Sequence, residues 1–149
     1  MDDVRKTIEV VAAVVTHAGR VMAVKKGVTR HAYTSCRWEF PGGKIEAGET
    51  PQQALARELR EEMLMAVEVR EHIITVTHDY PDFTIVMHAY HCTVQSTQCT
   101  LTEHTAVEWL APAELLTLDW CPADKPIARA VADNPPELSE SADCLNCCD

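Results

Sequence analysis

The chain has 149 residues, of which 46% are hydrophobic and 24% are charged. These values are typical of one globular domain and exclude a mainly disordered chain or a collagen-like repeat. Lysine and arginine number 13 against 23 aspartate and glutamate residues, so the formal net charge is −10. A surface of this charge repels the phosphates of DNA and RNA, and we expect no nucleic-acid polymer as a partner.

No apolar run approaches the ~18 residues that a membrane-spanning helix needs, so we expect no membrane partner either. The first residues, MDDVRKTIEVV, begin with acidic side chains and lack the basic and apolar regions of a signal peptide. We therefore expect a soluble, cytoplasmic protein. In that compartment the seven cysteines are expected to be mainly free thiols.

The first part of the chain predicts strands separated by turns and one loop. Ile8–Thr16 is rich in β-branched residues and indicates a buried strand. Arg20–Lys26 follows a short turn and is expected to pair with it as a hairpin. Gly27–Arg37 has no apolar period and indicates a loop. Trp38–Phe40 indicates a short strand that the breaker residues Pro41–Gly43 end.

A helix is predicted to begin after Thr50. Threonine is a good N-cap, Pro51 suits the first helical position, and Gln53 completes the pattern of a capping box. An apolar residue recurs every four positions, at Leu55, Leu59 and Met63. This spacing places the three side chains on one face, which we expect to pack on the rest of the domain.

The second part predicts two long strands, a short strand and two short helices. Their ranges are Val67–Thr77, Phe83–Val94, Val107–Leu110, Ala113–Leu116 and Lys125–Ala132. The mixed order of strands and helices predicts an α/β fold with helices covering a mixed sheet. We expect residues 1–132 to form the domain and the Pro-rich, Cys-containing residues 133–149 to form a flexible tail.

The predicted helix carries an unusual concentration of acidic side chains. At 3.6 residues per turn, Glu58 lies beside Glu61 and Glu62, and like charges at this spacing destabilise a helix. A bound cation would reverse that effect, and oxygen ligands select hard ions such as Mg²⁺ or Mn²⁺. An isolated cluster of this kind is more often a solvated acidic face, so its sequence context decides the interpretation.

That context resembles the Nudix hydrolase family. Gly43, Glu49 and the segment Arg57–Glu62 (RELREE) have the spacing and residue types of the Nudix box, and residues 38–51 (WEFPGGKIEAGETP) are MutT-like. The resemblance extends weakly over residues 8–131. It implies a Nudix-type α/β/α sandwich with a mixed sheet. It also implies hydrolysis of a nucleoside triphosphate to a monophosphate and pyrophosphate, with Mg²⁺ as cofactor and Mn²⁺ as a substitute.

One position departs from the family box. The box usually has a glycine where this chain has Leu64, and that glycine ends the helix in a left-handed conformation. Leucine in the same conformation costs about 1 kcal/mol, or else the helix ends in a different way. Because the glycine is not a ligand, we expect the chemistry to be preserved.

The resemblance also implies roles for individual residues. The implied metal ligands are Glu58, Glu61, Glu62, Glu103 and the carbonyl oxygen of Gly42. Either Glu58 or Glu103 would act as the general base that takes a proton from the attacking water. Glu49 is expected to pair with Arg57 and orient the cluster, without binding the metal directly.

Other residues are expected to contact the nucleotide. Lys26 and Lys44 are candidates for binding phosphate, although a lysine is more often plain surface charge. Asp124 is the candidate for reading the base, because an ionised carboxylate only accepts hydrogen bonds and suits the amino group of cytosine. Phe40 either stacks on the base or packs in the core.

The chain resembles the CTP pyrophosphohydrolase branch in the segments Tyr80–Phe83 and Ala123–Pro126. Hydrolysis of 8-oxo-dGTP, for nucleotide-pool sanitation, is the main alternative, because aspartate also occurs at the base-reading position of some 8-oxo-purine enzymes. Pro81 gives a weaker indication of an ADP-ribose hydrolase. A binding module without catalysis is disfavoured, because the glutamates of the box are all present.

The cysteines near the C-terminus raise a different possibility. Cys144, Cys147 and Cys148 could hold Zn²⁺ with one more ligand or take part in redox chemistry. No histidine follows them, so we favour a flexible, oxidisable tail.

Overall fold

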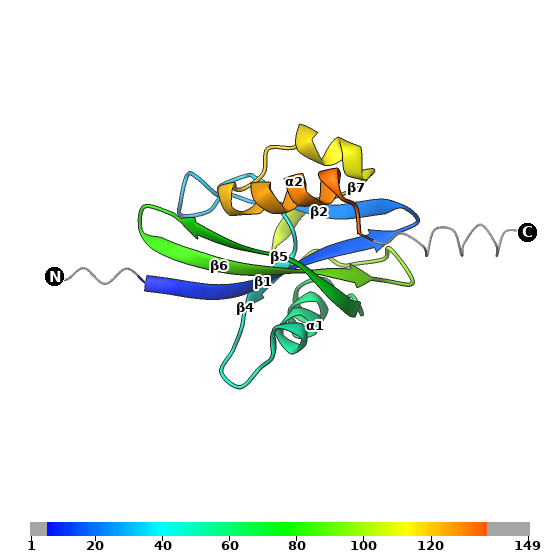
Figure 1. Cartoon of the computed structure of the whole chain (residues 1–149), viewed down its shortest axis with the longest axis horizontal. Coiled ribbons are helices and arrows are strands. Elements are labelled where there is room, and N and C mark those ends of the chain that lie inside the picture. The colour runs from blue at the N-terminus through cyan, green and yellow to red at the C-terminus, as the bar shows by residue number, and fades with distance from the viewer. Residues whose placement is uncertain (1–5, 137–149) are drawn as a thin grey trace, which may run out of the picture.

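The computed structural model describes residues 6–136 and consists of a mixed sheet covered by helices on both faces (Figure 1). The strands are β1 (Lys6–His17), β2 (Arg20–Lys26), β3 (Trp38–Glu39), β4 (Gly42–Lys44), β5 (Glu68–Asp79), β6 (Phe83–Thr93) and β7 (His104–Leu110). The helices are α1 (Pro51–Met63), α2 (Lys125–Asp133) and two 3₁₀ helices, η1 (Pro112–Thr117) and η2 (Pro122–Asp124).

The sheet is built around β1, which has a different partner on each edge. The strand order is β3-β2-β1-β6-β5, with β4 paired to β1 and β7 paired to β2. β1 runs parallel to β6 along its length, whereas its pairings with β2 and β4 are antiparallel. The sheet is therefore mixed, and the predicted α/β sandwich is confirmed.

Alternate side chains of β1 supply two separate cores, as expected for a strand buried on both faces. On one face Val10, Ala12 and Val14 pack in a core that includes Trp120 and Ile127. The neighbouring residues Val11, Ala13 and Val15 pack on the other face with Leu55 and Leu59 of α1. Figure 1 shows α1 and α2 on opposite sides of the sheet.

Helix α1 begins as the sequence predicts. The side chain of Thr50 accepts a hydrogen bond from the Gln53 backbone N–H at 3.1 Å, and the Gln53 side chain accepts from the Thr50 N–H at 3.0 Å. Pro51 occupies the first turn. The predicted apolar face is buried at Leu55, Leu59 and Met63, so the charged face of the helix is left free for other contacts.

The segment after β3 differs from the prediction of a strand ended by a breaker. β3 covers only Trp38–Glu39, and Gly42–Lys44 forms β4, a short strand paired to β1. A Cβ on Gly42 would overlap the carbonyl of Val11. Glycine therefore permits the close backbone approach that the pairing requires. The residues that predict a turn instead form a strand, which brings the segment before α1 onto the sheet.

Smaller differences concern the last third of the chain. The segment predicted as a helix at Ala113–Leu116 is the 3₁₀ helix η1, and the strand predicted at Val107–Leu110 begins earlier, at His104. No helix within residues 6–136 is long and apolar enough to cross a membrane. The four cysteines in this range, Cys36, Cys92, Cys99 and Cys121, are free thiols. Cys144, Cys147 and Cys148 lie outside the described residues.

Helix α1 ends in the left-handed geometry that the usual glycine of the box would adopt. Leu64 has φ 53° and ψ 38°, and its backbone N–H donates to the carbonyl of Arg60 at 3.0 Å. The N–H of Met65 donates to the carbonyl of Leu59 at 3.2 Å. The helix thus keeps its C-cap at a cost of about 1–2 kcal/mol for a residue with a side chain.

We expect Leu64→Gly to raise the free energy of unfolding by about 0.5–1 kcal/mol, because the relief of left-handed strain exceeds the extra entropy of glycine in the unfolded chain. Leu64 is 66% exposed, so little packing is lost. Urea denaturation would measure the change. Leu64→Ala is the matched control, since it shortens the side chain and keeps the strain. A Leu64→Gly protein no more stable than Leu64→Ala would contradict this explanation.

Candidate active site

The charged face of α1 is organised by one arginine, Arg57. Its guanidinium forms a forked pair with Glu49, with N···O distances of 2.6 and 2.9 Å. The same group donates to Glu58 at 3.1 Å, to Glu61 at 3.3 Å and to the backbone carbonyl of Lys44 at 3.1 Å. Arg57 thereby connects the helix to β4 and to the loop between them, and the predicted Glu49–Arg57 pairing is present.

This pairing keeps Glu49 and Arg57 ionised. The hydrogen bonds from Arg57, and a further one from the Glu46 backbone N–H, lower the pKa of Glu49 to about 2. The bonds to Glu49 in turn raise the pKa of Arg57. Both oxygens of Glu49 are occupied by these donors, which agrees with an orienting role and not with that of a metal ligand.

Four carboxylates converge where α1 meets β4. A Cβ on Gly43 would overlap the carboxylate of Glu58, so that group rests directly on the backbone of β4. Glu62 is half-buried, and burial raises its pKa to about 8, helped by a hydrogen bond with Glu58 and by the charges of Glu58, Glu103 and Glu39. Burial and the neighbouring carboxylates both disfavour the ionised form of Glu62, and a nearby cation would favour it.

These residues fit a divalent cation. The donors are carboxylate oxygens, the ligands that hard ions prefer, and a cation would remove the repulsion that raises the pKa of Glu62. Glu61 stands apart from them: its side chain is 61% exposed and is held by Arg57. Within residues 6–136, the carboxylates of Glu58, Glu61 and Glu62 do not lie within 4.8 Å of one another. A cation held by all three would draw Glu61 away from Arg57.

A cavity of about 360 Å³ opens beside the carboxylates, within the size range of small-ligand sites. Its polar wall consists of Lys26, Glu39, Glu62, Glu103 and His104. Its apolar wall includes Val10, Phe40, Ile85 and Met87, and the loop residues Gly27, Val28 and Thr29 close one side. Gly42 and Gly43 also line it, whereas Lys44 is exposed on β4 and does not.

Glu39 is a site residue that the sequence analysis did not single out. Its carboxylate receives a hydrogen bond from Lys26 Nζ at 3.4 Å and lies 2.9 Å from His104 Nε2. The His104 side chain is only 5% exposed. A charged residue between two aromatic residues, Trp38 and Phe40, is the signal that could have marked Glu39.

Lys26 is part of the same arrangement. Burial alone would lower the pKa of Lys26, but the neighbouring negative charges, with Glu39 first among them, raise it above its usual value. The amine therefore stays charged at the cavity wall, where it can meet an anionic ligand.

Asp124 lies behind this wall and not on it. The residue ends η2, is 2% exposed and accepts a hydrogen bond from the Phe40 backbone N–H at 3.0 Å. Burial raises its pKa well above the usual value, and the charge of Glu39 adds to this effect. One oxygen of Asp124 lies within 4.8 Å of both a Glu39 carboxylate oxygen and Cys121 Sγ. Asp124 and Glu39 therefore form a coupled pair of carboxyl groups.

Phe40 is mainly a core residue. It is 3% exposed, and its ring stacks on Trp120 with centroids 4.5 Å apart. The residue still contributes to the cavity wall, so the structure brings both predicted base-binding residues, Asp124 and Phe40, to the same end of the cavity as Glu39.

The comparisons with known proteins identify the family. The NUDIX domain family matches residues 6–131. The chain belongs to the NUDIX family. It is 34% identical to the CTP pyrophosphohydrolase of Escherichia coli K12 over 125 residues, which are 84% of this chain and 91% of the relative. It is 32% identical to the 8-oxo-dGTP diphosphatase of the same organism over 96 residues, 64% of this chain and 74% of that one.

Solved structures of this family share the fold. The E. coli ORF135 protein aligns with a TM-score of 0.74 at 33% identity, covering 89% of this chain and 96% of that protein. The MutT protein of a methicillin-resistant Staphylococcus aureus aligns with a TM-score of 0.69 at 36% identity, covering 87% and 98%. The family and the Nudix-type sandwich inferred from the sequence are thus confirmed, and the chain is a Nudix hydrolase. Nudix hydrolases generally use divalent metal ions.

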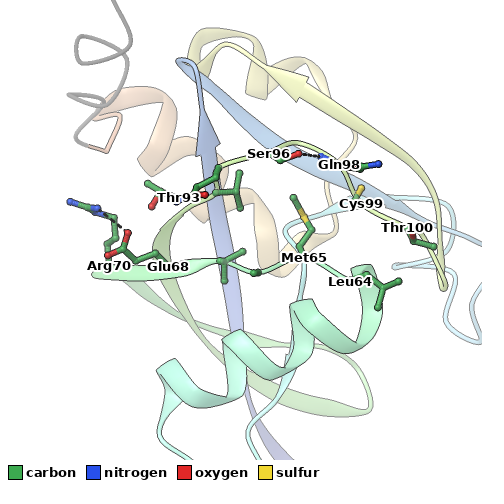
Figure 2. A pocket seen from close by; sticks show the side chains of 13 residues that line it. Leu64, Met65, Glu68, Arg70, Thr93, Ser96, Gln98, Cys99 and Thr100 are labelled. Atoms are coloured by element: carbon green, nitrogen blue, oxygen red, sulfur yellow. Dashed lines mark hydrogen bonds and ion pairs between the residues drawn. The ribbon is translucent and has the colours of Figure 1, made fainter. Parts of the chain in front are cut away.

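This Nudix hydrolase has a second, larger hollow of about 850 Å³ at the C-terminal end of α1 (Figure 2). Leu64 and Met65 lie on the helix side, and Cys99 and Thr100 come from the segment after β6. The single carboxylate in its lining, Glu68, pairs with Arg70 at 3.7 Å. Because the hollow lacks clustered metal donors, the smaller cavity beside Glu58 and Glu62 is the candidate active site.

The Glu49–Arg57 pair predicts a stability change at acid pH. The pKa of Glu49 falls from 4.5 to about 2 on folding, so its contribution is complete above 4.5 and is lost as the pH falls towards 2. We expect Glu49→Gln to lower the free energy of unfolding at neutral pH and to differ less from wild type at each lower pH. Denaturation in metal-free buffer between pH 7 and pH 2 would measure this difference.

The matched control for this experiment is Glu46→Gln. Glu46 lies 3.7 Å from the same guanidinium and its side chain is 66% exposed, so the substitution should have a small effect throughout. If Glu49→Gln and Glu46→Gln changed stability equally at every pH, the forked pair would not be the source of the effect.

Proposed function

We propose that this Nudix hydrolase is a Mg²⁺-dependent nucleoside triphosphate pyrophosphohydrolase that acts on CTP, dCTP or modified cytosine nucleotides. The observation that carries the proposal is the convergence of Glu58, Glu62 and Glu103 beside a cavity that also contains Lys26. The cavity thus offers carboxylates for a metal and a cation for a phosphate. The name of the E. coli relative, CTP pyrophosphohydrolase, supports the choice of substrate.

Glu58, Glu62 and Glu103, with Glu61 and the carbonyl of Gly42, would hold the Mg²⁺, and Mn²⁺ could take its place. A bound ion would neutralise phosphate oxygens and lower the pKa of water. Glu58 or Glu103 takes the proton of the attacking water, and the products are a nucleoside monophosphate and pyrophosphate. Arg57 and Glu49 fix the orientation of Glu58 throughout.

The phosphates need a cation from the protein as well. Lys26 lies in the cavity wall and is held charged by Glu39, so we assign it to a phosphate oxygen. Lys44 is exposed on β4 outside the cavity lining, and it would contact only a phosphate that extends out of the cavity.

The carboxyl pair Glu39 and Asp124 suits the edge of cytosine. Burial raises the pKa of Asp124, and with a proton on Asp124 the two carboxyl groups together have one hydrogen-bond donor and one acceptor. Cytosine presents its N4 amino group as a donor beside the N3 acceptor. Glu39 faces the cavity, and Asp124 behind it fixes the charge and hydrogen-bonding state of the pair.

The same pair supports a second candidate substrate, 8-oxo-dGTP. The oxidised purine has an N7–H donor beside the O6 acceptor, whereas unmodified guanine has two acceptors at these positions. A carboxyl pair with one proton therefore complements the oxidised base and not the normal one. The 8-oxo-dGTP diphosphatase of E. coli, also similar to this chain, supports this alternative.

We expect excess EDTA to abolish hydrolysis and Mg²⁺ to restore it, because the repulsion among the glutamates requires a cation. Glu61→Gln and Glu62→Gln should each lower kcat at least ~100-fold, the scale of losing an important electrostatic group. Glu108→Gln, an exposed glutamate of β7, is the matched control and should retain full activity. Activity that persists in EDTA would refute the metal mechanism.

The base assignment is tested by measuring kcat/KM for CTP, dCTP and 8-oxo-dGTP. Asp124→Asn can still accept from the Phe40 N–H but alters the charge of the pair. An asparagine cannot exchange a proton with Glu39, so the carboxyl group that lines the cavity is expected to lose one well-matched hydrogen bond to the base, worth about 1 kcal/mol. We therefore expect a loss of several-fold to about tenfold on cytosine nucleotides and a larger loss for Asp124→Ala.

Asp119→Asn is the control for the base assignment, because Asp119 is exposed and pairs with Arg37. If the wild-type kcat/KM for 8-oxo-dGTP exceeded that for CTP and dCTP by more than about tenfold, the cytosine assignment would be wrong and the oxidised purine would be the substrate. If wild type, Asp124→Asn and Asp124→Ala had the same preference among the bases, Asp124 would not determine specificity.

A further inference from the structure

The loop between β2 and β3 forms one wall of the active-site cavity through Gly27, Val28 and Thr29. Hydrogen bonds within the loop make it compact. The N–H of Cys36 donates to the carbonyl of Gly27 at 3.0 Å, and the Thr29 hydroxyl donates to the carbonyl of His31 at 2.9 Å. Whatever holds the far side of this loop therefore also positions the cavity wall.

The far side is attached to the turn between β5 and β6. The ring of Tyr33 stacks on Tyr80 with centroids 4.6 Å apart, and the ring of His31 stacks on Tyr33 with centroids 4.9 Å apart. The Tyr33 hydroxyl donates to Asp82 Oδ2 at 3.0 Å, and His31 Nδ1 lies 3.4 Å from the same oxygen. One carboxylate of the turn thus binds two residues of the loop.

The same turn also contacts the segment that carries the base-reading residue. Tyr80 is 4% exposed, and its hydroxyl oxygen accepts a hydrogen bond from the Ala123 backbone N–H at 3.1 Å. Ala123 directly precedes Asp124 in η2. The turn is therefore in contact with two parts of the site that are far apart in the sequence.

We propose that the β5–β6 turn is a positioning strut, in which Asp82 holds the 27–37 loop and Tyr80 holds η2, so that the turn sets the spacing that selects the base. Neither Asp82 nor Tyr80 lines the cavity, so both act through the segments that they hold. The inference rests on the proposed function for its effect on substrate choice. The attachment itself can be tested without any substrate.

The rate of cleavage by trypsin tests whether the turn holds the 27–37 loop in place. Arg30 lies exposed in the loop next to His31, and cleavage after Arg30 requires the loop to open. We expect Asp82→Ala to accelerate this cleavage about fivefold, as the loss of a charged hydrogen bond at the surface implies. Asp79→Ala is the matched control, because Asp79 accepts a hydrogen bond from Thr84 within the same hairpin at 2.6 Å. Equal cleavage in the two variants would overturn the strut.

Kinetics test the effect on substrate choice. Asp82→Ala should raise KM for CTP about three- to tenfold and leave kcat within about twofold. Asp82→Asn keeps an acceptor for Tyr33 and should recover part of the loss. Tyr80→Phe keeps the ring stack and removes the acceptor of the Ala123 N–H, so it should reduce the preference for CTP over 8-oxo-dGTP without faster cleavage at Arg30. Unchanged KM in Asp82→Ala despite faster cleavage would refute the positioning role.

The two proposals fail in different ways. A wild-type protein that hydrolyses none of the nucleotides would refute the proposed function, and the cleavage comparison of Asp82→Ala with Asp79→Ala would still decide whether the turn holds the loop. A wild-type protein that is active, with cleavage and KM unaffected by Asp82→Ala, would refute the strut alone.

Discussion

The mutual repulsion of carboxylates at the junction of α1 and β4 is the constraint on which the rest of the site depends. Burial raises the pKa of Glu62 to about 8, and the charges of Glu58, Glu103 and Glu39 add to this effect. A chain with a net charge of −10 places further negative charge here at a cost in stability. Arg57 offsets part of that cost from the helix side, and a divalent cation would offset the remainder from the cavity side.

The backbone makes this concentration of charge possible. Gly42 lets β4 approach β1, and Gly43 leaves room for the carboxylate of Glu58 against the strand. The capping box fixes where α1 begins, and therefore which side of the helix faces β4. The glycines leave room for the acidic side chains, and Arg57 holds them in place. The Nudix box therefore depends on the spacing of its residues along the chain as well as on their charges.

Much of this arrangement could be predicted from local sequence. Thr50, Pro51 and Gln53 specify the start of α1 by short-range hydrogen bonds, and the spacing of Leu55 and Leu59 specifies its buried face, so these predictions were confirmed. β4 was missed because its pairing depends on contact with a distant strand. The sequence shows that Gly42 and Gly43 lack side chains. It does not show that the backbone of β1 lies against Gly42 or that the Glu58 carboxylate lies against Gly43.

Glu39 shows the same limit in the active site. Its importance comes from Lys26, His104 and Asp124, which lie on other elements and meet only in the folded chain. The predicted place of Asp124 on the cavity surface also changes, since the residue is 2% exposed and lies behind Glu39. The local pattern predicts Asp124 as the base-reading residue, whereas tertiary packing places the carboxylate of Glu39 in the cavity wall.

The parallel pairing of β1 with β6 has a consequence for how the chain folds. Two parallel strands must be joined by a long connection. Here Lys6 at the start of β1 pairs with Phe83 at the start of β6, so the pairing can form only after the chain between them has been made. During synthesis the apolar residues of β1 are made well before β6 and before α2, which covers one face of the sheet. The nascent chain therefore carries an exposed strand edge for much of its translation, when it is most open to aggregation. Its folding rate should be limited by this long-range closure.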